Sequence, residues 1–309
     1  MVTTRQMKLS ITYLYTIFRY GYPPKPRDDF RALADIEKMG FHFLEMEALG
    51  PDHAAGVWDN RVELKKAFAD HGIHVHNFCG VDPDLVSLDD TRRRAAYERF
   101  KRVAELTAFF DAETLHLASY APPVDYIGGS PYALGQDYQF GDTFRIRVPD
   151  GFDWSKVWSV LVESCRVTAG VAAQRGKTII MEPRVGEIIC SVDSMIRLID
   201  DVAMPNFKAN VDTGHFSAQR ENVPLALEKL RGKFANIHVS DNDPANTDHL
   251  PIGDGTIDWP EFFRLLKRQG YDRYLGLDLG NRPTLVDDLN RSADRLQQLA
   301  AEQGIVLQR

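Results

Sequence analysis

Cysteine is scarce in this sequence. Three are present among 309 residues, at Cys79, Cys165 and Cys190, and no two of them have the close spacing of a disulfide framework or a zinc-thiolate site. We therefore expect free, buried thiols. Cys79 follows an expected strand, and for this residue a place in the wall of a pocket is the alternative.

Long apolar runs and an excess of positive charge are also missing. No run approaches the roughly 20 apolar residues that cross a bilayer, and residues 1–7 lack the apolar stretch of a signal peptide. The net charge is -7, with acidic and basic residues interspersed, so the sequence offers no basic stripe for a polyanion. These absences argue against membrane and nucleic-acid partners and favour a cytoplasmic protein.

The chain has enough hydrophobic residues to form one large core. Hydrophobic residues make up 44% of the chain, and a single α/β barrel commonly uses roughly 250 residues, so we expect one domain over residues 1–309. Apolar β-rich segments alternate with helical patterns. The expected strands cover residues 8–18, 41–46, 71–79, 113–118, 178–182, 207–211, 234–238 and 274–278. The expected helices cover residues 30–40, 62–68, 90–110, 154–174, 193–201, 225–232, 259–269 and 287–303.

Eight strands that alternate with eight helices predict a single-domain (β/α)8 TIM barrel, because parallel strands must be joined by crossover connections. A doubly wound open sheet is the alternative α/β fold. No glycine-rich phosphate loop follows the first strand, and this absence makes the open sheet the weaker interpretation.

The least regular part of the chain follows the fourth strand, at residues 120–152. A connection of this length without regular structure is uncommon in a compact domain and is usually functional. Its aromatic residues are Tyr120, Tyr126, Tyr132, Tyr138, Phe140, Phe144 and Phe152. They either form a small satellite core that orders the loop or line an apolar annex of the active site, as an aromatic part of a substrate would require.

Four of the expected strands end in side chains that can bind a metal ion. Glu182, Asp212, His238 and Asp278 close the fifth to eighth strands in turn. In a parallel barrel such strand ends form a ring at one mouth, where catalytic groups project. Any one of these residues alone could cap a helix or form a salt bridge. Four of them at equivalent positions on successive strands predict a divalent-metal site. Oxygen-rich ligands with one imidazole favour Mn, with Mg or Co as alternatives.

A metal site of this kind serves proton abstraction next to a carbonyl group. A divalent cation that holds a carbonyl and a neighbouring hydroxyl stabilises the enediolate charge, and a nearby carboxylate or imidazole removes the proton. The candidate bases are Glu182, Glu187, His215 and Asp278; for Glu187 an exposed loop acid is the equal alternative. His116, flanked by leucines on the fourth strand, is either an active-site residue or a hydrogen-bonded core histidine.

The sequence resembles the xylose isomerase-like barrels, which include sugar phosphate isomerases and ketose 3-epimerases. The segments 181–183, 212–215, 238–241 and 249–259 carry the resemblance. It implies that Glu182, Asp212 and His238 are metal ligands and that His215 either supports these ligands or contacts the substrate. Asp278 stands where the family usually has a glutamate that also acts as acid or base. The family's arginine after the seventh strand has no clear counterpart, and His249 is nearest to it.

A narrower resemblance is to the α (catalytic) subunits of bacterial C-glycoside deglycosidases, carried by residues 11–16, 18–24, 120–123 and 190–193. It implies a metal-dependent lyase that cleaves the C–C bond of a 3-keto-C-glycoside by enolisation and β-elimination of an aromatic aglycone, in complex with a small β subunit. The expected substrate contacts are Tyr120, Arg184, Glu187 and His249.

Three other functions are open at this point. A metal-dependent isomerase or 3-epimerase of a ketose or sugar phosphate would use the same enolisation without cleavage and without a partner chain. A sugar-binding barrel without catalysis is a second possibility, although all four ligand positions hold ligating side chains. A metal-dependent endonuclease of the same superfamily is disfavoured by the acidic net charge.

Overall fold

The computed structural model describes residues 5–129 and 145–309. Its parallel strands follow the order β10-β9-β8-β7-β4-β3-β2-β1, and β1 pairs with β10, which closes the barrel. The (β/α)8 fold is thereby confirmed. The barrel strands are β1 (Arg5–Ile11), β2 (Phe43–Leu49), β3 (His74–Val81), β4 (Thr114–Ala118), β7 (Thr178–Glu182), β8 (Phe207–Asp212), β9 (Phe234–Val239) and β10 (Tyr274–Leu277).

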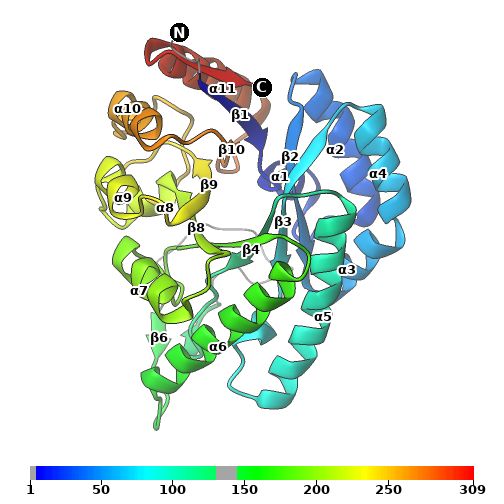
Figure 1. Ribbon diagram of the computed structural model, residues 1–309, viewed down its shortest axis with the longest axis vertical. Helices are drawn as coiled ribbons and strands as arrows, with labels where there is room; N and C mark the ends of the chain where they lie inside the picture. Colours follow the sequence, from blue (N-terminus) through cyan, green and yellow to red (C-terminus); the bar gives the residue numbers. More distant parts are fainter. Residues whose placement is uncertain (1–4, 130–144) are drawn as a thin grey trace.

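Helices surround the strands on all sides (Figure 1). The first half of the chain forms the right-hand side of that view and the second half the left-hand side. The helices are α1 (Leu14–Tyr20), α2 (Pro26–Lys38), α3 (Gly50–Asp59), α4 (Arg61–Asp70), α5 (Asp90–Phe109), α6 (Trp154–Ala173), α7 (Val192–Val202), α8 (Thr213–Ala218), α9 (Val223–Lys229), α10 (Trp259–Gln269) and α11 (Leu285–Glu302), with a 3-10 turn, η1, at Pro83–Val86.

Each strand is buried on both faces because helices cover its outer side and other strands face its inner side. All five residues of β4 are buried, as are all four of β10. The covering helices are amphipathic: α10 buries Trp259, Phe262, Phe263, Leu265 and Leu266 on one side. The apolar half of each helix and the outward-facing residues of the strands together form the main core, between the ring of helices and the barrel wall.

The first expected strand was too long. β1 ends at Ile11, and residues Leu14–Tyr20 form α1 instead. A β-rich sequence misled the prediction here, and burial shows no helical spacing in this segment: Tyr15 and Thr16 are buried as well as Leu14 and Ile17, which pack into the core. The correction matters for the site, since α1 places Leu14 and Ile17 at the mouth of the barrel.

Further elements were not expected, among them two helices and three strands. Helix α3 follows β2 directly, and α8 follows β8. Strands β5 (Asp125–Ile127) and β6 (Arg145–Arg147) pair in antiparallel fashion within the irregular segment after β4. Finally, β11 (Ile305–Gln308) pairs with residues 5–8 of β1, beside the point where β2 begins to pair with that strand.

A buried polar network ties α1, α2 and α3 together beside the mouth. The Tyr13 hydroxyl donates to Oδ1 of Asp29 at 2.5 Å and lies 3.2 Å from Nε2 of His53. Nδ1 of His53 accepts the Leu49 N–H at 3.1 Å, so the Nε2–H of the neutral ring points to Tyr13. Burial raises the pKa of the Asp29 carboxyl to about 7.

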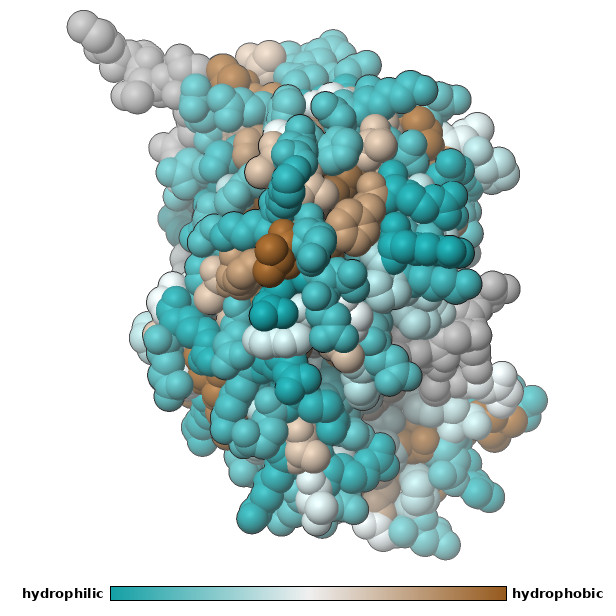
Figure 2. All heavy atoms as spheres, turned by 90° about the vertical axis from the view of Figure 1, so that its right-hand side faces the viewer, coloured by the Kyte–Doolittle hydropathy of each residue, from teal (hydrophilic) through white to brown (hydrophobic). Residues whose placement is uncertain are grey.

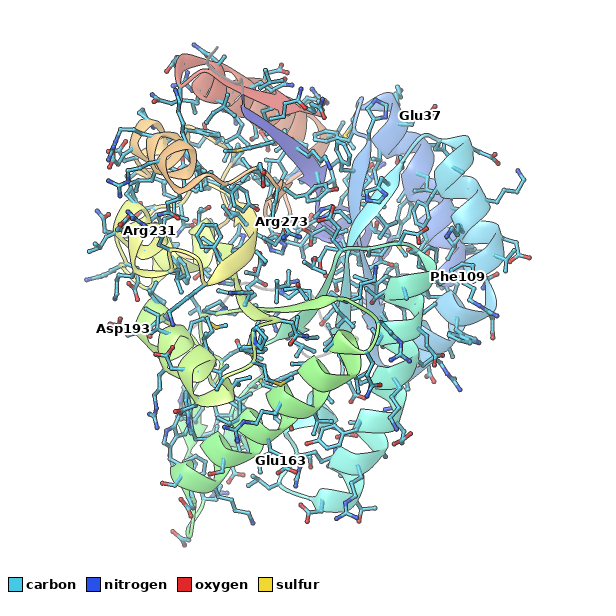
Figure 3. All side chains as sticks on the ribbon, viewed as in Figure 1. Glu37, Phe109, Glu163, Asp193, Arg231 and Arg273 are labelled. Atoms are coloured by element: carbon cyan, nitrogen blue, oxygen red, sulfur yellow. The ribbon has the colours of Figure 1, made fainter. Side chains whose placement is uncertain are left out.

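The opposite end of the barrel is closed by side chains that cross its floor. Arg273, which lies near the middle of the ring in Figure 3, donates to Glu113 at 2.8 Å. The Tyr274 ring stacks on His76 with 3.8 Å between ring centroids, and Nζ of Lys8 lies 4.7 Å from the Tyr274 ring centre. Access to the interior is therefore from the mouth, at the carboxyl ends of the strands.

The outer face of helices α2 to α5 is mainly hydrophilic, with small scattered apolar areas (Figure 2). Over the described residues, no helix is long and apolar enough to cross a membrane. Residues 130–144, which include Tyr132, Tyr138, Phe140 and Phe144, lie outside the described part of the chain. The expectation of an aromatic satellite core or annex therefore stays a prediction for these four residues.

Candidate metal centre and pocket

A pocket of about 310 Å³ lies at the mouth of the barrel. The polar side contains strand-end residues of the second half of the barrel together with Glu47 of β2 and His116 of β4, and the other side is mainly apolar and comes from the first half. The polar lining includes Glu47, His116, Glu182, Arg184, Glu187, His215, His238 and Asp278. The apolar lining includes Leu14, Ile17, Tyr22, Leu49, Val81, Pro83, Val86 and Tyr120.

Three of the expected metal ligands come together at the polar side. One ligand atom each from Glu182, Asp212 and His238 lies within 4.8 Å of the other two. Nδ1 of His238 is 2.9 Å from Oε1 of Glu182 and 3.8 Å from Oδ2 of Asp212. Neighbouring parallel strands explain this convergence, because β8 and β9 pair Asp212 directly with His238. Strand ends in register place their inward side chains at one height in the barrel.

Asp278 reaches the same group from β10. Its Oδ1 is 4.0 Å from Nδ1 of His238, and its Oδ2 is 3.1 Å from Nδ1 of His249. The same nitrogen of His249 is also 2.9 Å from the Asp278 carbonyl oxygen. His249 is fully buried and supports Asp278 from behind, so its expected contact with a substrate stays a prediction.

His215 and His116 flank the three converging ligands. His215 follows Asp212 in the first turn of α8, where Oδ1 of Asp212 accepts its N–H at 2.8 Å. Nε2 of His116 lies 3.7 Å from Oε2 of Glu182. Burial lowers the pKa of both imidazoles, that of His116 to about 4. Both rings are therefore neutral near pH 7 and able to accept or donate a hydrogen bond at the pocket.

Glu187 and Arg184 form an ion pair in the wall. Nε and Nη2 of Arg184 donate to the two carboxylate oxygens of Glu187 at 2.9 and 2.5 Å. The Ser119 hydroxyl also donates to Glu187 at 2.5 Å. The alternative of an exposed loop acid is wrong, because Glu187 is 7% exposed and lines the pocket.

Tyr120 marks the corner where the chain leaves β4. Its backbone has a φ of 61°, an uncommon conformation for a bulky residue and one that concentrates at functional sites. Its carbonyl oxygen accepts the Ile188 N–H at 2.8 Å, and its hydroxyl donates to the Gly80 carbonyl at 3.4 Å. These contacts fix Tyr120 in the pocket wall. Cys79 also lines the pocket, and its thiol is buried.

Charge inside the cluster follows from close contacts in a buried space. Burial alone would lower the pKa of His238, but Glu45 and Glu182 outweigh it and hold that pKa well above its usual value. Burial raises the pKa of Glu182, yet His238 outweighs this effect and the pKa lies well below normal. Burial and the nearby Glu182 and Asp278 carboxylates raise the pKa of Asp212. Such a concentration of carboxylates needs a positive partner.

Sequence reasoning missed Glu45 and Glu47 on β2. They are two residues apart and so share the inner face of the strand. Glu45 is 3% exposed and contacts His238, whereas Glu47 lines the pocket beside Tyr22 and Cys79. Burial raises the pKa of Glu47 to about 8. The sequence does contain a signal for Glu45 and Glu47, because two carboxylates at alternate positions of an otherwise apolar strand point to the same face.

The donor set fits a divalent cation. Two carboxylates and one imidazole are brought together in a buried space, and Asp278 stands within reach as a further oxygen donor. Oδ2 of the fully buried Asp212 has no hydrogen-bond partner among the described residues. A buried, unsatisfied carboxylate oxygen is costly unless a cation or donor meets it.

The family model for the xylose isomerase-like TIM barrel matches residues 33–302. The chain belongs to this family. Its sequence is similar to that of the L-ribulose-5-phosphate 3-epimerase UlaE of Salmonella heidelberg, with 24% identity over 248 residues that cover 78% of each chain.

Two solved structures are similar to this xylose isomerase-like barrel. The D-psicose 3-epimerase of Clostridium cellulolyticum H10 has a TM-score of 0.73 at 18% identity, covering 95% of this chain and 99% of the other. The 3-keto-D-glucoside 4-epimerase YcjR of E. coli has a TM-score of 0.71 at 20% identity, covering 94% and 99%. At these identities the structures establish the shared fold.

Proposed function

We propose that this chain is a divalent-metal-dependent enzyme that enolises a keto sugar and returns the proton to the opposite face, so that the outcome is epimerisation. The convergence of Glu182, Asp212 and His238 at one end of the pocket is the observation that carries the proposal. The sugar epimerases among the relatives support epimerisation over bond cleavage as the outcome.

The division of labour follows from the contacts. Glu182, Asp212 and His238 would hold the ion, with Asp278 as a fourth ligand; Mn, Mg and Co all suit this donor set. The bound cation would polarise the substrate carbonyl and make the adjacent C–H more acidic. An epimerase needs one group to remove a proton from one face and another to deliver a proton to the other. Glu182 and Asp278 are the carboxylates that we assign to these roles.

His215 and His116 orient the sugar hydroxyls in this scheme, because both rings line the pocket and stay neutral near pH 7. Glu187 is less suited to act as a base than the other carboxylates. Its two oxygens are already held by Arg184 and Ser119, so proton uptake would break an ion pair. We assign Glu187, Arg184 and Tyr120 to the wall that contacts the substrate.

We further propose that the sugar carries no phosphate. Among the described residues, Arg184 is the only lysine or arginine that lines the pocket, and Glu187 pairs with it at both carboxylate oxygens. Glu47, Glu182 and Asp278 add further acidic groups. A phosphate dianion would meet carboxylates here instead of the arginine and lysine groups that recognise it.

Cleavage of a 3-keto-C-glycoside is the second candidate function, and the apolar wall of the pocket favours it. Leu14, Ile17, Val81 and Val86 offer an aromatic aglycone a surface that a free monosaccharide does not need. The first step would be shared: a base takes the C2 proton. A C1–C2 double bond then forms as the C1–aryl bond breaks, and an acid in the site protonates the departing aryl carbon. In this case a small β subunit is the proposed partner.

One incubation series separates these outcomes. Mn²⁺-loaded protein, alone and with candidate β subunits, is mixed in D2O with free ketoses, ketose phosphates and 3-keto-C-glucosides, and the products are followed by NMR. Deuterium next to the carbonyl of an intact, inverted ketose supports the epimerase, and release of the aglycone supports the lyase. Turnover that survives exhaustive chelation contradicts both, and a preference for ketose phosphates contradicts the neutral substrate.

A further inference from the structure

The metal ligand His238 is held from its other side by a carboxylate deep in the barrel. Nε2 of His238 donates to Oε2 of Glu45 at 2.9 Å, while Nδ1 faces Glu182 and Asp212. An imidazole offers a metal only the nitrogen that carries no proton. A carboxylate accepts hydrogen bonds but does not donate when ionised, so Glu45 keeps the proton on Nε2.

Glu45 itself is fixed by neighbours on two other strands, β3 and β9. Nδ2 of Asn77 donates to its Oε2 at 2.8 Å, and Nδ2 of Asn236 donates to its Oε1 at 3.0 Å. Nε2 of His76 lies 3.5 Å from Oε1. Asn77 is in turn oriented by the Thr114 hydroxyl at 2.7 Å. Every group that approaches Glu45 in these contacts can donate a hydrogen bond. An ionised carboxylate can accept all of them, whereas a neutral side chain with its own N–H or O–H group would face another donor.

The backbone also makes room for this carboxylate. Gly276 lies beside His238 in the pairing of β9 with β10. A Cβ atom at Gly276 would stand 2.9 Å from Oε1 of Glu45 and 3.2 Å from Cδ2 of His238. The first contact is shorter than Cβ atoms normally make and the second is tighter than most, so a side chain at this position would push against both groups.

We propose that Glu45 is a positioning residue that fixes the tautomer and orientation of His238, so that Nδ1 is the nitrogen presented to the metal. This inference rests on the proposed metal-dependent function. Carboxylates that hold a ligating histidine raise the basicity of the ring and typically account for 10- to 100-fold in metal affinity. Glu45 lies beneath the pocket and does not line it, so it acts through His238 and not on the substrate.

The test measures metal binding without substrate, which keeps its outcome separate from that of the proposed reaction. Mn²⁺ affinity is determined by calorimetry for the wild type, Glu45→Gln and Ser10→Ala. Ser10 is fully buried in the same layer and contacts His76, not His238, so Ser10→Ala is the matched control. We expect the dissociation constant to rise 10- to 100-fold in Glu45→Gln and to stay within about twofold in Ser10→Ala. Equal affinity in Glu45→Gln and wild type, or an equal loss in Ser10→Ala, overturns the proposal.

A second measurement needs no variant of Glu45 and covers the case in which Glu45→Gln does not fold. In wild-type protein with ¹⁵N-labelled histidine, Zn²⁺ serves as a diamagnetic probe, and His238→Gln identifies the signals. Nδ1 of His238 should shift on Zn²⁺ binding while Nε2 keeps its proton. A shift at Nε2 instead overturns the proposal. Zn²⁺ binding at Nδ1 without turnover of any sugar would contradict the proposed reaction and leave the role of Glu45 intact.

Discussion

The two halves of the barrel contribute different things to the same pocket. The candidate ligands and proton carriers lie at or next to the ends of strands β7 to β10: Glu182, Asp212, His238 and Asp278. The first half supplies Glu45, which supports one of those ligands, and most of the apolar wall. The residues assigned to the chemistry thus lie on four successive strands. The residue that holds one of them in place, Glu45, lies on a strand far away in the sequence.

The largest expected effect tests the second half. Asp212→Asn removes one carboxylate from the three converging ligands, and the loss of several kcal/mol of electrostatic stabilisation should lower kcat/KM by roughly 10³-fold or more. Mn²⁺ affinity should fall with it, as measured by calorimetry. Asp193→Asn, on the surface of α7, is the control and should leave both unchanged. Full activity in Asp212→Asn would remove this residue from the metal site.

The next prediction concerns the network that holds the first half together at Asp29. Burial raises the pKa of this carboxyl from 3.8 to about 7, so the folded state holds the proton more tightly than the unfolded chain. Its contribution to stability is therefore complete below about pH 4 and is lost as the pH rises to 7.

Asp29→Asn removes this dependence. The free energy of unfolding of the variant minus that of the wild type should rise between pH 4 and pH 7.5, by at most roughly 4 kcal/mol. Burial lowers the pKa of His53 to about 4, and because this opposing effect is present in both proteins, it cancels in the difference. Urea denaturation across this pH range provides the measurement. A difference that stays flat would show that Asp29 ionises normally inside the network.

A smaller effect tests the apolar wall. Val86→Ala removes two methyl groups from the pocket lining, worth about 1 kcal/mol of burial, so KM for a keto-glycoside with an aromatic substituent should rise about five- to tenfold. KM for an unsubstituted ketose should change little. Leu225→Ala on the exposed side of α9 is the matched surface control. Equal changes for both substrates would mean that the wall does not contact a substituent.

The smallest expected effect lies at the floor. Arg273→Ala breaks the ion pair with Glu113, but both side chains are more than a third exposed, and such pairs contribute about 0 to 1 kcal/mol. Thermal unfolding should shift by only a few degrees, and kcat/KM should stay unchanged. A large loss of activity would contradict the view that the floor of the barrel does not affect the reaction at the mouth.

Much of the second half could be predicted from sequence because its ligands stand at the ends of short apolar strands. An acidic group or imidazole at such a place is conspicuous, and the regular alternation of strands and helices sets the register that brings Glu182, Asp212 and His238 together. The barrel itself was predicted for the same reason: its periodicity is local and repeated.

The other features of the fold and the site depend on contacts between distant parts of the chain or on segments without a clear sequence pattern. Glu45 sits inside an apolar strand, and its role depends on His238, which is 193 residues away and across the barrel. Helix α1 has a β-rich composition, and its residues from Leu14 to Ile17 are buried one after another, so no helical spacing of buried residues distinguishes it from a strand. For His249 the substrate contact stays a prediction, and its contact with Asp278 is defined only by the folded loop after β9.

The hydrogen bond from His238 to Glu45 joins β9 to β2, and between them lies the seam where β10 pairs with β1. Under the proposed role of Glu45, the hydrogen bond that orients His238 forms when this seam closes. Tight binding of the metal during refolding would then come after the barrel has closed. Metal binding would therefore report on barrel closure, whereas helical content measures only the formation of helices.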